Sequence, residues 1–276
     1  MANTLEDLVK SYLQGGSLHA IPQTIAEPYL VSVAEGEVAG HVPWSKNGHT
    51  AGAGTSETDV WTGATSYSFP AAEMGMEVVS TDNTNDKEGG TGALTVKIYY
   101  LTLLGVAKTE TVTLNGTAAV ATVATDIYRV NNFVVASTGT SGKAAGTISL
   151  RHLSDTPTYA QISAGYTRDR SSIYTVPAGK VLYVTSLAVS TLNASADKGA
   201  RITLRATYDD LADAATTPGV LFMPYFEIAA RNGTFMRTFE LPLRFVAGTD
   251  IKTSVTAEAA STTCTIGLRG WLESED

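Results

Sequence analysis

The side chains best suited to bind a metal are few in this sequence, and their spacing is not that of metal ligands. A structural zinc site typically shows paired cysteines or a helical pair of histidines. The chain has a single cysteine, Cys264, which also excludes an internal disulfide. We predict no metal and no cofactor, Cys264 as a small core residue, and exposed or hydrogen-bonded histidines at positions His19, His41, His49 and His152.

Two loops resemble ion-binding or phosphate-binding motifs without completing them. Residues 82–90 place oxygen-bearing side chains at alternate positions before a glycine, which is a weak calcium-loop pattern that lacks the distal glutamate of a helix–loop–helix hand. A solvated loop is the alternative, and calcium binding there stays open. Residues 137–143 resemble a phosphate loop, but Ala144 stands where serine or threonine is needed. We interpret this segment as a strand connection.

Catalytic patterns are also incomplete. No G-x-S-x-G turn for a nucleophilic serine occurs. A glycosidase needs two carboxylates across a cleft, usually beside aromatic rings. Asp209, Asp210 and Asp213 cluster after a predicted strand, but aromatic residues make up only 8% of the chain. We expect a solvated rim there, predict no catalytic residues, and rank a carbohydrate-active enzyme as the weakest hypothesis.

The net charge and the hydropathy of the chain limit the classes of partner that it can bind. The formal net charge is −8, which argues against a basic nucleic-acid face and against docking on an anionic membrane. The first residues are not those of a signal peptide, and no apolar run is long enough for a membrane span. We therefore expect synthesis and assembly in a cytoplasm, with no nucleic-acid or membrane partner.

The elements that would carry any site are strands. Period-two alternation is clear at residues 94–99 and 109–114, and further strands are predicted at 127–136, 145–151, 180–190, 200–208, 219–230, 234–246, 250–257 and 263–272. Asn115-Gly116 and Asn232-Gly233 are strong tight-turn signals. Large apolar residues on both sides of the second turn, at 223–226 and 235–239, favour a core hairpin, with a subunit contact as the alternative.

The N-terminal region differs from the rest. Residues 4–14 have helical periodicity, and Gly15-Gly16 would end that helix. Residues 15–58 contain several prolines and glycines without strong periodicity, so we predict an extended arm that contacts neighbouring subunits, with a strand at Tyr29–Val33 as a possibility.

An internal duplication is the most informative pattern in the chain. The block Tyr67–Ala71 matches Tyr174–Ala178, and the triplet at 79–81 matches that at 189–191. An Asp-Lys loop and an alternating strand follow each triplet. Each half then ends with Thr-Ile-x-Leu-Arg, at 147–151 and 265–269. Preserved order over five blocks indicates two copies of one domain.

These patterns predict an all-β fold. We expect two tandem jelly-roll-like β-sandwich domains preceded by a short N-terminal helix and an extended arm. The predicted limits are 1–58 for the helix and arm, 59–155 for the first sandwich and 156–276 for the second.

Two segments resemble structural proteins of tailed bacteriophages. Residues 92–131 look like a segment common in such proteins, and Ile173–Lys180 resembles the Pro-Ala-Gly-Lys entry into a sandwich of head-decoration and fibre-type proteins. The first copy departs from this pattern, with Ala72-Glu73 where the second has Gly179-Lys180. The resemblance implies a multimeric virion component and carries no catalytic residues.

The functional hypothesis is therefore a non-enzymatic capsid component, either a decoration or cement protein or a shell subunit. Its partners would be the major capsid protein or other virion subunits, together with copies of itself as a trimer or dimer, in a virion assembled in the host cytoplasm. A tail or fibre module that recognises the host surface is the alternative.

Overall fold

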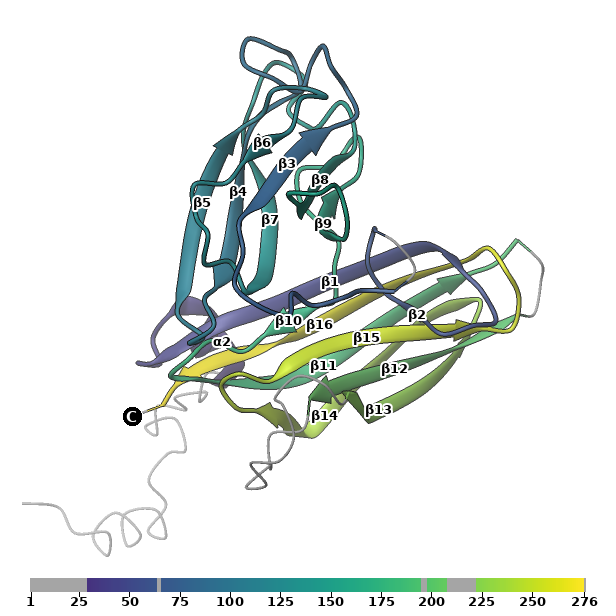
Figure 1. The fold of residues 1–276 in the computed structure, drawn as a ribbon. Coiled ribbons are helices and arrows are strands. Elements are labelled where there is room, and N and C mark those ends of the chain that lie inside the picture. Colours follow the sequence, from purple (N-terminus) through teal and green to yellow (C-terminus); the bar gives the residue numbers. More distant parts are fainter. Residues whose placement is uncertain (1–28, 64–65, 195–197, 208–221, 276) are drawn as a thin grey trace, which may run out of the picture. The chain divides into compact units, whose positions relative to one another are not determined.

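The fold was analysed in a computed structural model that describes residues 29–63, 66–194, 198–207 and 222–275. The described part is all-β with one short helix, as the strand patterns predicted (Figure 1). The chain divides into two compact units, Met1–His41 and Val42–Asp276. The predicted helix at residues 4–14 and the carboxylates at 209, 210 and 213 lie outside the described residues.

In the first unit the described residues form helix α2, Tyr29–Glu35. Gly36 ends this helix with a φ of 79°, and its amide donates to the carbonyl of Val33 at 3.2 Å. The suggested strand at Tyr29–Val33 is therefore wrong. A short apolar run does not distinguish a strand from a helical turn, and the glycine stop decides here.

The predicted irregular arm is also wrong over its last part. Residues His41–Ala53 form strand β1, which lies beside β16 (Thr262–Ser274) (Figure 1). Its buried residues alternate at Trp44, Lys46 and Gly48. The partner strand is more than two hundred residues away in the sequence, and the lysine and glycine interrupt the apolar pattern that would have revealed a strand.

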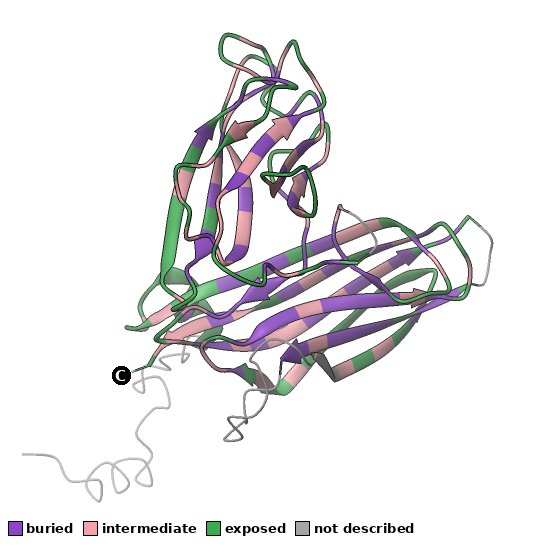
Figure 2. Ribbon diagram, viewed as in Figure 1, coloured by how far each residue is buried: buried purple, intermediate pink, exposed green. Residues whose placement is uncertain are grey.

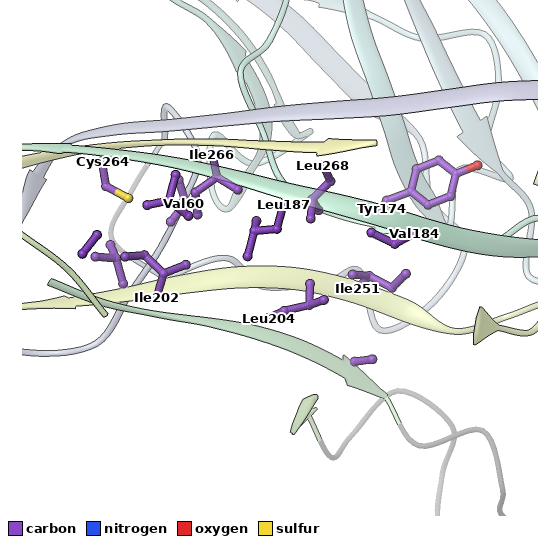
Figure 3. Packing of buried hydrophobic residues seen from close by; sticks show 14 of the residues in the cluster. Val60, Tyr174, Val184, Leu187, Ile202, Leu204, Ile251, Cys264, Ile266 and Leu268 are labelled. Atoms are coloured by element: carbon purple, nitrogen blue, oxygen red, sulfur yellow. The ribbon is translucent and has the colours of Figure 1, made fainter. Parts of the chain in front are cut away.

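The strands after residue 173 build two sheets around one core, together with β1 and β2 (Thr58–Asp59). The sheet orders are β1-β16-β11-β14 and β10-β15-β12-β13, and β2 pairs with β15. Figure 3 shows side chains of both sheets meeting in this core, among them Leu187, Ile202 and Ile266. We call these two sheets and their shared core module 2. Its other strands are β10 (Tyr174–Thr175), β11 (Lys180–Leu192), β12 (Gly199–Thr207), β13 (Phe222–Arg231), β14 (Gly233–Phe245) and β15 (Asp250–Ala257).

The strands between residues 76 and 162 form a second pair of sheets, module 1. Their orders are β6-β3-β8-β9 and β5-β4-β7, and both sheets contribute to a separate core that contains Ile98, Phe133 and Leu150. Figure 2 shows buried positions, in purple, along the strands of this module. The strands are β3 (Met76–Ser80), β4 (Ala93–Leu101), β5 (Ala107–Thr113), β6 (Val120–Ala121), β7 (Arg129–Thr138), β8 (Ile148–His152) and β9 (Thr158–Ile162).

The two modules repeat one strand order, which supports the predicted duplication. The sheet β6-β3-β8 corresponds to β14-β11-β16, and β5-β4-β7 corresponds to β13-β12-β15. The register of the sequence match shifts by one residue, since Ser80 pairs with Ile148 whereas Val189 pairs with Ile266. A shift of one residue exchanges the faces of a strand, which explains why Val79 is half-buried and Val189 buried.

The tight turn predicted at Asn115-Gly116 is present, since Asn115 and Ala118 form an antiparallel bridge and the amide of Ala118 donates to the carbonyl of Asn115 at 3.1 Å. Asn115-Gly116 lies between β5 and β6. Asn232 lies between β13 and β14, and Gly233 is the first residue of β14. In each case the two strands belong to different sheets. The chain thus crosses from one sheet to the other at equivalent places. Gly116 has a positive φ of 63° within its tight turn, a conformation that glycine adopts without steric cost.

The core expected around the second turn forms only in part. Phe226 and Phe239 pack edge to face at 5.0 Å against the core of module 2. Phe235 and Met236 are exposed, at 42% and 69%. Strand β14 is an outer strand of its sheet, so part of its apolar surface is uncovered.

The tandem arrangement needs a correction at its N-terminal end. Because β1 and β2 pair with β16 and β15, residues 41–59 complete module 2, and module 1 lies between them and the rest of module 2 in the sequence. The jelly-roll form is not confirmed, since the described strands of module 1 form sheets of four and three strands whereas a jelly roll has eight strands. The predicted limits 59–155 and 156–276 stay predictions.

Candidate functional site

The two modules meet at a buried ion pair. The guanidinium of Arg129 faces the carboxylate of Asp250, with Nη2 to Oδ2 at 2.9 Å and Nε to Oδ1 at 3.0 Å. The side chains are only 6% and 2% exposed. Such a pair in a low-dielectric setting is stable only if its remaining hydrogen-bonding capacity is also satisfied.

That capacity is satisfied by groups of both modules. The other Arg129 donors reach the carbonyl oxygens of Pro70 and Tyr128 and the hydroxyl of Tyr128, at 2.8 to 3.2 Å. Thr175 donates its hydroxyl to Oδ1 of Asp250 at 2.5 Å. Asn131 joins the same network, because its amide exchanges two hydrogen bonds of 2.8 Å with the backbone of Thr175. No donor of Arg129 is left for a ligand, so the cluster is a structural joint.

The joint lies at matching places in the duplicated fold. Arg129 is the first residue of β7, and Asp250 is the first residue of the corresponding strand β15. The repeated blocks also meet here, since Pro70 belongs to the first block and Thr175 to the second. A cavity of about 530 Å³ beside the joint is lined by both Ala71 and Ala178. The starts of two corresponding strands are thus joined by opposite charges.

A second cavity, of about 450 Å³, lies between β1, β4, β7 and the segment 168–171. Lys46 lines it and is only 9% exposed, and its Nζ donates to the carbonyl of Asn131 at 2.5 Å. Asp169, 8% exposed, accepts a hydrogen bond from the amide of Phe133 at 3.1 Å. We call this cavity the lysine pocket.

Burial perturbs both charges of the lysine pocket. Desolvation lowers the pKa of Lys46 from its usual value, with Asp169 opposing this shift and Arg168 adding to it. Desolvation likewise raises the pKa of Asp169, and Lys46 opposes that shift. Perturbed charges inside a cavity are typical of functional sites.

The sequence analysis did not predict this pocket, because its central residue, Lys46, lies in the segment interpreted as an extended arm. Lys46 is on the buried face of β1, between Trp44 and Gly48. Once β1 is known to be a strand, a lysine at an inward position stands out. The sequence signal is weak, since only one large apolar residue accompanies it.

The candidate calcium loop is held together by its own carboxylates. Asp86 is completely buried and accepts hydrogen bonds from the hydroxyl of Ser80 at 2.6 Å and from the amides of Ala93, Ala145 and Gly146 at 2.8 to 2.9 Å. Asp82 accepts from the amides of Thr84 and Asn85. These donors occupy the carboxylate oxygens that calcium would need, so Asp86 acts as a structural anchor.

The other sequence candidates are scattered. His49 contacts Thr265 at 2.9 Å, His41 contacts the carbonyl of Ala39 at 2.9 Å, and His152 accepts from the amide of Ser154. His19 lies outside the described residues. Cys264 is buried in the core of module 2, as predicted (Figure 3). Within the described ranges no cluster of histidine, cysteine and acidic residues could hold a metal, and no helix there is long and apolar enough to cross a membrane.

Comparisons with known proteins add little. No protein-family model and no curated protein sequence matches the chain. A structure of the Gt strain of infectious bursal disease virus is 14% identical, covers 84% of this chain and 70% of its own, and has a TM-score of 0.18. The VP2 subviral particle of the same virus is 10% identical, covers 86% and 77%, and has a TM-score of 0.17. Likenesses this weak carry no argument about this chain.

Proposed function

We propose that the chain is a non-enzymatic structural protein of a bacteriophage virion, and specifically a capsid component. It would be a decoration or cement protein that stabilises the head, or a shell subunit built from two jelly-roll-like sandwiches. The observation that carries the proposal is the Arg129–Asp250 joint. It fixes two copies of one β module to each other and leaves no guanidinium donor for chemistry, which suits a mechanical role.

Exposed apolar side chains support contacts with other subunits. The turn between β4 and β5 presents Leu103, Leu104 and Val106, which are 57%, 81% and 49% exposed. Apolar residues gathered on one turn are costly in water and favour burial against a partner. The partners we propose are the major capsid protein or other virion subunits, including copies of this chain as a trimer or dimer.

Antibody labelling of intact particles tests the location. We expect gold-labelled antibody raised against the purified chain to bind the head, and purified chain added to heads that lack it to raise their disruption temperature. Heads incubated with a Leu104→Asp variant are the matched control and should show a smaller rise. Label absent from particles, or no binding to heads, would contradict a capsid role.

The alternative function is a tail or fibre module that recognises the host surface. The lysine pocket favours it, because a recognition module needs a cavity with convergent polar groups. In this case the antibody would label the tail, and the purified chain would bind host cells instead of heads.

A further inference from the structure

Burying Lys46 in the lysine pocket costs free energy, because its charge is desolvated. Lys46 occupies an inward position of β1, where an apolar side chain would bury area without desolvating a charge. Among the described residues its Nζ donates to one carbonyl, that of Asn131, although an ammonium group has three donors. A buried lysine whose hydrogen-bonding capacity is only partly satisfied suggests that its charge binds a further group.

The charge of the pocket is positive although the chain is acidic. Lys46, Lys108, Arg168 and Arg170 line it, against one acidic side chain, Asp169. Lys108 is paired with Asp126 at 2.6 Å, outside the lining. Over the part of the chain that the structure describes, Arg168 forms no side-chain hydrogen bond or ion pair. The pocket therefore has the charge to attract an anion.

Arg170 supplies a second sign of a missing partner. Its guanidinium lies over the ring of Tyr166 at 3.9 Å, which fixes its plane. Its Nε is buried and has no hydrogen-bond partner among the described residues. A buried donor without a partner is uncommon in folded proteins and calls for a group that accepts from it.

The neutral lining is suited to a ligand rich in hydroxyl groups. Asn132 of β7 contributes an amide, Thr109 and Ser171 contribute hydroxyls, and the ring of Tyr99 is 36% exposed. Amides and hydroxyls both donate and accept, whereas an aromatic ring offers a flat apolar surface to the C–H groups of a sugar. A volume of about 450 Å³ is in the range of small-ligand sites and accommodates one or two sugar rings.

We propose that the lysine pocket binds an acidic saccharide, with its carboxylate beside Lys46, Arg168 and Arg170 and its ring against Tyr99. This inference concerns the purified chain and holds whether the protein is located on the head or on the tail. It assigns a recognition site that a purely mechanical role would not require.

Calorimetric titration of the full-length chain with glucuronate, glucose, acetate and inorganic phosphate tests the proposal. We expect glucuronate to bind about tenfold or more tightly than glucose, since only glucuronate forms charge-assisted hydrogen bonds. Acetate and phosphate should bind more weakly than glucuronate, because they have no ring. The affinity for glucuronate should fall as salt is raised.

Three variants locate the site. Arg168→Gln removes an exposed, unpaired cation and should weaken glucuronate binding about tenfold without changing the melting temperature. Arg201→Gln, an exposed arginine of β12 outside the pocket, is the matched control and should bind as the unaltered chain does. Lys46→Met should abolish binding. Lys46→Met alone also leaves the buried Asp169 carboxylate without its neighbouring cation and should lower the melting temperature. The double variant Lys46→Met/Asp169→Asn should therefore regain the melting temperature without regaining glucuronate binding.

Equal affinity for glucuronate and glucose, or no binding of either, would overturn the proposal. Acetate or phosphate binding as tightly as glucuronate would overturn the saccharide assignment. Unchanged glucuronate binding in Arg168→Gln and in the double variant would show that the sugar binds elsewhere. None of these results depends on where antibody labels the virion, so failure here and failure of the capsid proposal are distinguishable.

Discussion

At the residue scale, Arg129 and Asp250 depend on each other. Each is almost completely buried, and the remaining hydrogen-bonding groups of both are satisfied by neighbours from the two modules. Removing one partner leaves the other charge buried without compensation, whereas removing both leaves a polar cavity. Any arrangement that separates the two strand starts would therefore leave buried charges without a partner.

We predict that Asp250→Asn lowers the free energy of unfolding by about 3–5 kcal/mol, because it leaves Arg129 charged and buried. Urea denaturation followed by tryptophan fluorescence measures this. The control is Asp126→Asn, which breaks the exposed Lys108–Asp126 pair and should cost no more than about 1 kcal/mol. Equal losses in the two variants would mean that Arg129–Asp250 is no stronger than a surface pair.

Cys264 allows a chemical test of the core of module 2. Burial raises the pKa of its thiol to about 12, so almost no thiolate exists at neutral pH. We expect iodoacetamide to leave Cys264 unmodified in the folded chain and to alkylate it rapidly in urea, as followed by mass spectrometry. Rapid alkylation of the folded chain at pH 7.5 would contradict its burial.

At the scale of elements, Asp86 shows how one carboxylate orders a loop. The residue lies between β3 and β4, and its oxygens accept from the end of β3, the start of β4 and the segment before β8. Three connections of module 1 thus share a single acceptor. The sequence predicts a polar, solvated loop here. In the structure a buried carboxylate holds the loop in place, because backbone amides of distant segments donate to Asp86.

We expect Asp86→Ala to destabilise the chain by about 3 kcal/mol or more, since it leaves several buried donors unpaired. Asp82→Ala, in the same loop but only half-buried, is the matched control and should have a smaller effect. Thermal unfolding monitored by circular dichroism compares them. If added calcium raised the melting temperature of the unaltered chain but not that of Asp86→Ala, the structural interpretation of this loop would be wrong.

At the scale of the whole molecule, the modules are two copies that are not simply consecutive. Module 2 is completed by β1 and β2, which precede module 1 in the sequence. The chain therefore starts module 2, builds module 1 and returns to finish module 2. The two modules are therefore linked both by this connection and by the Arg129–Asp250 joint.

Shortening the chain tests this connection. A chain that begins at residue 60 lacks β1 and β2, which contribute Trp44 and Ala53 to the core of module 2. We expect it to lose module 2, because deletion of a buried tryptophan alone typically costs about 3–5 kcal/mol and the edge of β16 is also uncovered. Limited proteolysis should then cut after residue 173 while module 1 persists. A chain that begins at Val42 is the control. Full resistance of the shorter chain would restore the interpretation of residues 15–58 as an arm.

The sequence determined most of the long strands and the repeat. Period-two patterns placed β11, β12, β15 and β16 within two residues of their observed ends, and the repeated blocks predicted a shared strand order, because alternation and local turn chemistry are encoded in neighbouring residues. What only the tertiary structure decided is which strands pair. The strand β1, the crossings at the two Asn-Gly sites, the Arg129–Asp250 joint and the lysine pocket all arise from contacts between residues far apart in the chain. No local pattern records those contacts, since the free energy that selects them comes from burial against partners that the neighbouring residues do not contain.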